Sequence, residues 1–156
     1  MTPNDYATEF ERVNEEVITF VRSCSDDQWR TNVPGENWPV GVVMHHVAAG
    51  HQQVGSWIES ARDGRDIAIT GDAIDSANAR HAEEQVEVTA SETVELLGSN
   101  GAALAALIRS LDEDEMQRKV RFASAGGALR STEQLCGAAS GHPRSHLAHA
   151  KEALTL

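Results

Sequence analysis

The sequence is poor in cysteine and in basic residues, and each shortage excludes a class of protein. The two cysteines among the 156 residues, Cys24 and Cys136, lie far apart and outside any paired spacing. This excludes a disulfide framework and a zinc ribbon. The 13 lysines and arginines stand against 24 aspartates and glutamates, which gives a formal charge of −11. Because that charge repels phosphate backbones and anionic lipid surfaces, we expect no nucleic-acid partner.

Long apolar runs are also missing. No stretch approaches the roughly 20 apolar residues that a membrane-spanning helix needs. The N-terminal stretch MTPNDYATEFERVNEE carries acidic residues where a secretory signal has a basic start and an apolar core. We therefore expect a cytoplasmic protein without a membrane partner. Its length and hydrophobic content of 40% predict one domain, residues 1–156, with a core of its own.

Four segments have apolar residues at alternating spacings of three and four, which is typical of amphipathic helices. We expect these helices over residues 3–23, 39–63 and 89–111, and from residue 131 or 132 onward. Residues 75–87 are polar and predicted to be partly helical. Together the segments predict an all-α four-helix bundle. The long connections around residues 64–74 and 112–130, the second of which contains the irregular stretch KVRFASAGGALR, indicate that it is not the simplest short-loop form.

Histidines gather in the last predicted helix, in the stretch GHPRSHLAHA over residues 141–150. When the apolar spacing is continued from Leu135, His142, His146 and His149 fall on one helix face. We expect that face to look into the bundle. Since a buried polar group without a partner costs about 1–3 kcal/mol, these imidazoles need hydrogen-bond partners or a metal ion.

The second predicted helix carries the stretch MHHVAAGH. His46 lies at the edge of the inward stripe that contains Val43 and Val47, whereas His45 turns about 100° away from it. One histidine of this helix can therefore meet two of the last helix in the bundle interior. Three neutral imidazoles leave coordination positions open, which is typical of a catalytic metal site. Imidazole suits zinc, nickel, copper or iron, and the spacing does not choose among them.

No general base or substrate-binding cation stands out. We expect His51 and His81 on solvent-exposed faces. The carboxylates that could act as a base are expected to be solvated surface groups: Glu59, Asp75, Glu83, Glu84 and Glu133. The arginines that either hold a substrate carboxylate or face water are Arg80, Arg130 and Arg144.

These stretches resemble the DinB/YfiT-like family of metalloenzymes, which includes the N-terminal domain of mycothiol-dependent maleylpyruvate isomerase. WPVGVVMHHV, residues 38–47, is similar to a family segment in which a tryptophan precedes the first ligand histidine by eight positions. The resemblance thus implies a ligand at His46. HPRSHLAHA is similar to the family's H-x-x-x-H and implies ligands at His142 and His146. His149 departs from the pattern, and it is a partner of a ligand, a fourth ligand or a substrate contact.

The resemblance also implies a function. Such proteins are four-helix bundles with long crossover connections that bind a divalent metal such as zinc or nickel and often dimerise. The metal activates the thiol of a low-molecular-weight cofactor, such as mycothiol or bacillithiol, or activates water. We therefore expect a homodimeric, thiol-dependent S-transferase or isomerase acting on a small molecule. The alternatives are a non-catalytic metal- or small-molecule-binding stress protein with the same site, and a metal-free helical interaction module.

Overall fold

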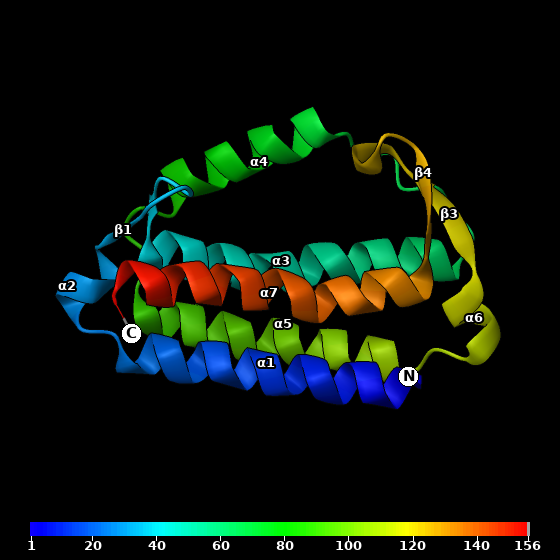
Figure 1. The fold of residues 1–156 in the computed structure, drawn as a ribbon, viewed down its shortest axis with the longest axis horizontal. Helices are drawn as coiled ribbons and strands as arrows, with labels where there is room; N and C mark the ends of the chain where they lie inside the picture. The colour runs from blue at the N-terminus through cyan, green and yellow to red at the C-terminus, as the bar shows by residue number, and fades with distance from the viewer. Residues whose placement is uncertain (156) are drawn as a thin grey trace.

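Four long helices form the body of the protein in the computed structural model, which describes residues 1–155 (Figure 1). They are α1 (Pro3–Ser23), α3 (Val40–Arg62), α5 (Ala90–Arg109) and α7 (Thr132–Ala153). Helices α1 and α3 each pack against both α5 and α7. The prediction of an all-α four-helix bundle with long connections is confirmed. Among residues 1–155, no helix has the length and apolarity needed to cross a bilayer.

Local sequence explains where these helices begin. Three of them start with a capping box, in which the N-cap side chain and the third helical side chain each bond to the other residue's backbone N–H. The pairs are Thr2 with Asp5, Thr89 with Glu92, and Ser131 with Gln134. Helix α3 begins after Pro39, whose backbone is extended. These boundaries agree with the predicted ones within a residue or two.

The buried apolar residues form two clusters, one toward each end of the bundle. The first contains Phe10, Ile58, Ile108 and Leu135, and the second contains Val17, Val43, Leu97 and Leu147. On every long helix, the residues that lie between the two clusters in sequence include a polar residue or a glycine: Asn14, His51, Gly101 and His142. A polar layer therefore crosses the middle of the bundle.

Asn14 and His51 link three helices within this layer. The Asn14 side-chain amide donates to the Leu97 carbonyl at 3.0 Å, and its Oδ1 lies 2.8 Å from His51 Nε2. The prediction that His51 faces solvent is wrong, because its exposed fraction is 2%. Position 51 continues the inward stripe of α3 from Val47, and the amide from α1 satisfies the imidazole that the stripe buries.

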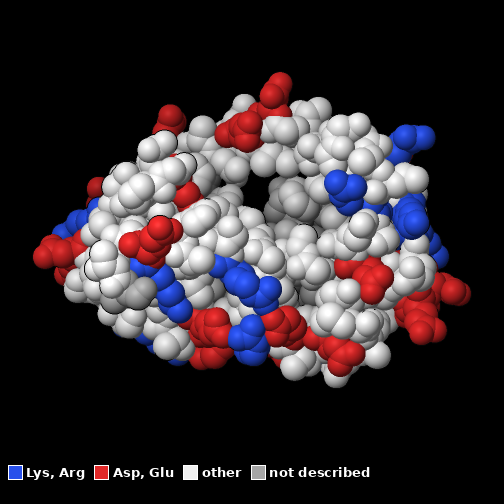
Figure 2. Space-filling model, in the orientation of Figure 1, with Lys and Arg blue, Asp and Glu red and all other residues white. Residues whose placement is uncertain are grey.

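Helix α4 lies apart from the bundle, over α3 (Figure 1). It spans Gly71–Glu84 and starts at the Thr70 cap, so it begins inside the stretch of residues 64–74 that we predicted to be a long connection. Each of its residues, all of which the structure describes, retains some solvent exposure. Figure 2 shows the surface hollowed between α4 and the bundle.

Two short antiparallel hairpins, which the sequence analysis missed, flank the bundle. Strands β1 (Asn32–Val33) and β2 (Trp38–Pro39) form the first hairpin, and β3 (Lys119–Phe122) and β4 (Ala128–Ser131) form the second. Helix α6 (Glu113–Gln117) and all of the second hairpin except Ser131 lie within residues 112–130, which were predicted to be a long connection. Strands of two to four residues are too short for a clear alternation of apolar and polar residues. The remaining short elements are α2 (Asp26–Trp29) and η1 (Ala123–Ala125).

Candidate metal centre

Three histidines from two helices point their Nε2 atoms at one place. His142 Nε2 lies 3.2 Å from His46 Nε2 and 3.1 Å from His146 Nε2, and all three nitrogens lie within 4.8 Å of one another. His142 and His146 are one turn apart on α7, and α3 packs beside that helix (Figure 1). The structure thus brings together the three residues predicted as ligands, and His46 rather than His45 joins the cluster.

The spacing of these nitrogens fits a bound cation. Zinc–imidazole bonds of about 2.0–2.1 Å in a tetrahedral site would separate two ligand nitrogens by about 3.3–3.4 Å. The observed separations of 3.1 and 3.2 Å are close to that value. His146 Nδ1 contacts a carboxylate, and its Nε2 on the other side of the ring faces the cluster. A cation would satisfy the three nitrogens together.

Burial keeps two of the imidazoles in the neutral form that binds metals. Burial, together with smaller contributions from the neighbouring imidazoles, lowers the pKa of His46 to about 3. Burial likewise lowers the pKa of His142 to about 4, with a smaller contribution from His146. These two rings are therefore uncharged at neutral pH, and each has one nitrogen lone pair available for a metal.

Glu36, in the turn between β1 and β2, contacts the far side of His146. Both of its carboxylate oxygens lie 2.9 Å from His146 Nδ1, and Oε1 lies 2.9 Å from His149 Nδ1. Burial raises the pKa of the Glu36 carboxyl, but the hydrogen bonds and charges of the two histidines outweigh burial and hold the pKa below its usual range. Glu36 was not predicted from the sequence, since nothing in a turn sequence indicates which helix the turn will contact.

His149 does not join the three-histidine cluster. Its side chain is 52% exposed, so the prediction that it points into the bundle is wrong. It lies on nearly the same face of α7 as His142 but two turns further along. There the β1–β2 hairpin lies against α7, and Glu36 is the residue that His149 meets. Three roles were left open for His149. The geometry favours a supporting role, because His149 contacts Glu36, which in turn contacts the predicted ligand His146.

His45 and His81 form a second pair of imidazoles beside the cluster. His45 Nδ1 lies 2.7 Å from His81 Nε2, and the rings are stacked. The ring of His81 is 5.8 Å from that of His46, measured between centroids. Burial lowers the pKa of both His45 and His81. The prediction of an exposed His81 is wrong, because α4 folds back over α3 and half-buries this side chain.

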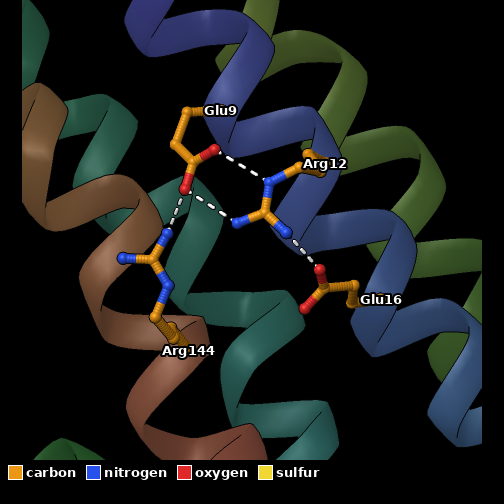
Figure 3. Close-up of polar contacts among 4 residues, drawn as sticks. All are labelled: Glu9, Arg12, Glu16 and Arg144. Carbon is orange, nitrogen blue, oxygen red and sulfur yellow. Dashed lines mark hydrogen bonds and ion pairs between the residues drawn. The ribbon is translucent and has the colours of Figure 1, made fainter.

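Within residues 1–155, none of the other charged candidates forms a hydrogen bond with the three clustered histidines. Arg144 forms an ion pair with Glu9 across the α1–α7 surface, and Arg12 joins Glu9 to Glu16 (Figure 3). Glu133 accepts a hydrogen bond from the Tyr6 hydroxyl at 3.0 Å. The remaining carboxylate candidates are exposed, as predicted: Glu59, Asp75, Glu83 and Glu84. Arg80 is exposed, and Arg130 donates to the neighbouring Leu129 carbonyl.

Comparison with known proteins agrees with this fold. A solved structure similar to this chain is that of YfiT from Bacillus subtilis, described as a probable metal-dependent hydrolase with an unusual four-helix bundle topology. The TM-score is 0.82 at 20% sequence identity, and the match covers 97% of this chain and 85% of YfiT. No curated protein matches the sequence. The sequence profile of the DinB superfamily matches residues 9–150, which include the three clustered histidines, and the chain belongs to that superfamily.

Proposed function

We propose that this protein is a divalent-metal-dependent enzyme that acts on a small molecule. The observation that supports the proposal best is the convergence of the Nε2 atoms of His46, His142 and His146 at separations that suit metal ligands. We propose zinc or nickel as the metal, because neutral imidazole nitrogen is a good ligand for both. Three protein ligands leave at least one position open.

The surroundings of the cluster support a reaction site. A divalent cation there would supply a Lewis acid that activates water or a thiol at neutral pH. His45 and His81 add polar side chains next to the cluster. The hollow between α4 and the bundle offers space for a substrate (Figure 2). The protein residues would thus bind the cation, fix its position and place polar groups near the reacting molecule.

We propose thiol-dependent S-transfer or isomerisation as the reaction, with a low-molecular-weight thiol such as mycothiol or bacillithiol. The resemblance of WPVGVVMHHV and HPRSHLAHA to thiol-using relatives supports this class. Such thiols stay reduced in the cytoplasm, where we place the protein. Hydrolysis is the second candidate, and the description of YfiT as a probable metal-dependent hydrolase favours it.

The first test is elemental analysis of protein purified without an affinity tag. The wild type should hold about one zinc or nickel ion per chain, and the variants His46→Ala and His142→Ala should hold none. Arg144→Ala serves as the control, because Arg144 lies between two of the histidines in sequence but pairs with Glu9 on the surface. A wild type that neither contains nor takes up zinc or nickel would overturn the proposal.

The second test separates the reaction classes in the metal-loaded protein. Consumption of mycothiol or bacillithiol in the presence of electrophilic small molecules, lost in His46→Ala, supports thiol transfer. Hydrolysis of ester or amide substrates without a thiol supports the hydrolase. Full metal occupancy without turnover in either assay supports instead the non-catalytic binding protein with the same site.

A further inference from the structure

Glu36 lies where it can fix the protonation pattern of one histidine in the cluster. We propose that Glu36 is the positioning residue of the metal centre. Its carboxylate accepts a hydrogen bond from the Nδ1–H group of His146, and this bond leaves the unprotonated Nε2 of the ring facing the metal. This inference rests on the proposed metal site. It assigns to a residue in a turn a role in the affinity for the metal.

The geometry excludes Glu36 as a ligand in this arrangement. Both carboxylate oxygens lie 2.9 Å from His146 Nδ1, whereas Nε2, on the opposite side of the imidazole, faces His142 at 3.1 Å. A neutral imidazole carries one proton. If Nδ1 donates that proton to Glu36, Nε2 has only its lone pair. The hydrogen bond therefore selects the tautomer that a metal requires.

The burial of Glu36 strengthens this hydrogen bond. The Glu36 side chain is 11% exposed and that of His146 is 20% exposed, so little water competes for the carboxylate. Hydrogen bonds to an ionised group are stronger than neutral ones, and more so where the local dielectric is low. A carboxylate on the outer nitrogen also makes the ligand imidazole more basic, and loss of such a partner costs about 10–100-fold in metal affinity.

Two further contacts fix the position of the carboxylate. His149, one turn from His146 on α7, places Nδ1 2.9 Å from Glu36 Oε1. The backbone N–H groups of Glu36 and Asn37 both point to the Val33 carbonyl, at 3.2 and 3.0 Å. Asn37 adopts a left-handed conformation with φ of +58°, which asparagine tolerates better than most residues. The tight turn and the α7 imidazoles thus hold the Glu36 carboxylate from two sides.

The experiment measures zinc affinity by competition with a chelator. We expect Glu36→Ala to bind zinc about 10–100-fold more weakly than the wild type. Glu36→Gln keeps an acceptor but loses the charge, so its loss should be smaller, and this near-isosteric variant also guards against misfolding in Glu36→Ala. Arg144→Ala is the control and should bind zinc as the wild type does. The unfolding temperature of each metal-free variant is recorded alongside.

A second readout reports the tautomer directly in the metal-free protein. Two-bond ¹H–¹⁵N NMR spectra should show His146 with the proton on Nδ1 in the wild type, and a shift toward the Nε2–H form in Glu36→Ala. His51 is an internal reference, because its Nε2 faces Asn14 Oδ1 and should stay protonated in every variant. A purely structural contact between the turn and α7 would not predict this change of tautomer.

The outcomes separate this inference from the proposed function. Zinc binding by the wild type with equal affinity in Glu36→Ala would overturn the role of Glu36 and leave the metal site standing. The role of Glu36 would also be overturned if Glu36→Ala bound zinc more weakly and unfolded at a lower temperature while the His146 tautomer stayed unchanged. Failure of the wild type to bind zinc or nickel would overturn the proposed function, and the inference with it.

Discussion

The imidazole of His142 lies directly against the backbone of α3 at Gly50. A Cβ atom at position 50 would come within 2.8 Å of His142 Cε1 and 3.2 Å of Nδ1, closer than packed carbon atoms approach. Within the described chain, His142 Nδ1 is buried without a hydrogen-bond partner, so close packing against α3 sets the position of that side of the ring. Because His142 Nε2 neighbours both other Nε2 atoms, Gly50 shapes the whole cluster.

Gly50→Ala should therefore weaken metal binding. The added methyl group must displace the His142 ring, and we expect zinc affinity to fall by about tenfold or more, as when other supporting contacts of a metal ligand are lost. Alanine has a higher helix propensity than glycine, so the substitution should not destabilise α3 itself. The measurement is zinc affinity by chelator competition.

Gly55→Ala is the matched control on the same helix. A Cβ there would meet Leu104 and Leu107 at 3.8 Å, an ordinary contact distance, and zinc affinity should not change. Equal affinities in Gly50→Ala and the wild type would show that His142 finds its place without close contact to α3.

Asn14→Ala should destabilise the bundle without touching the metal cluster directly. The substitution removes the acceptor for His51 Nε2 and the donor to the Leu97 carbonyl. A buried polar group left without a partner costs about 1–3 kcal/mol, and this loss should appear in urea unfolding. Asn4→Ala, an exposed change on the same helix, should stay within about 0.5 kcal/mol. Equal free energies of unfolding in the two variants would contradict the role of the polar layer.

The stability of the metal-free protein should depend on pH through His51. Burial lowers the pKa of His51 to about 4, whereas the unfolded chain titrates near 6.5. Between these values the unfolded state binds the extra proton, so the free energy of unfolding rises with pH, by at most about 1.4 kcal/mol per pH unit for one proton. The stability from this group is complete above pH 6.5 and is lost as the pH falls toward 4.

His51→Gln isolates this contribution, because glutamine keeps a donor for Asn14 but does not titrate. Its free energy of unfolding should rise less steeply between pH 4 and 6.5 than that of the wild type. The pKa values of His46 and His142 are also lowered, so these residues add to the pH dependence of unfolding in the same direction. They do so equally in the wild type and in His51→Gln. Parallel slopes for the two proteins would contradict the prediction.

Arg144→Ala should have little effect on folding or metal binding. Its guanidinium pairs with Glu9 on the surface, and Glu9 also pairs with Arg12 (Figure 3). Exposed ion pairs contribute little to stability, and salt screens them. We expect an unfolding temperature within a few degrees of the wild type and unchanged turnover in any assay that detects activity. A large loss of turnover with intact metal content would contradict this prediction and support a role for Arg144 in binding the substrate.

The helical repeat explains why much of the site could be predicted. The i, i+4 spacing places His142 and His146 on one face of α7, and the stripe through Val43 and Val47 separates His46 from His45. The same reasoning failed for His149, since helical periodicity gives the direction of a side chain but not what covers it two turns further along. The prediction also failed for His51, which we expected on a solvent-exposed face although it follows Val47 by one helical turn and is buried.

The sequence by itself determined the four long helices, their caps and the helix faces that carry His46, His142 and His146, because these follow from periodicity and capping residues within short segments. The convergence of His46 with His142 across 96 positions depends on the packing of α3 against α7. Tertiary structure alone decided the partners of the polar groups. Glu36 meets His146 across 110 positions, His51 meets Asn14 across 37, and His45 meets His81 across 36. Such contacts depend on how separate elements pack. Burial requires that each polar group find a partner, but no local pattern specifies which one.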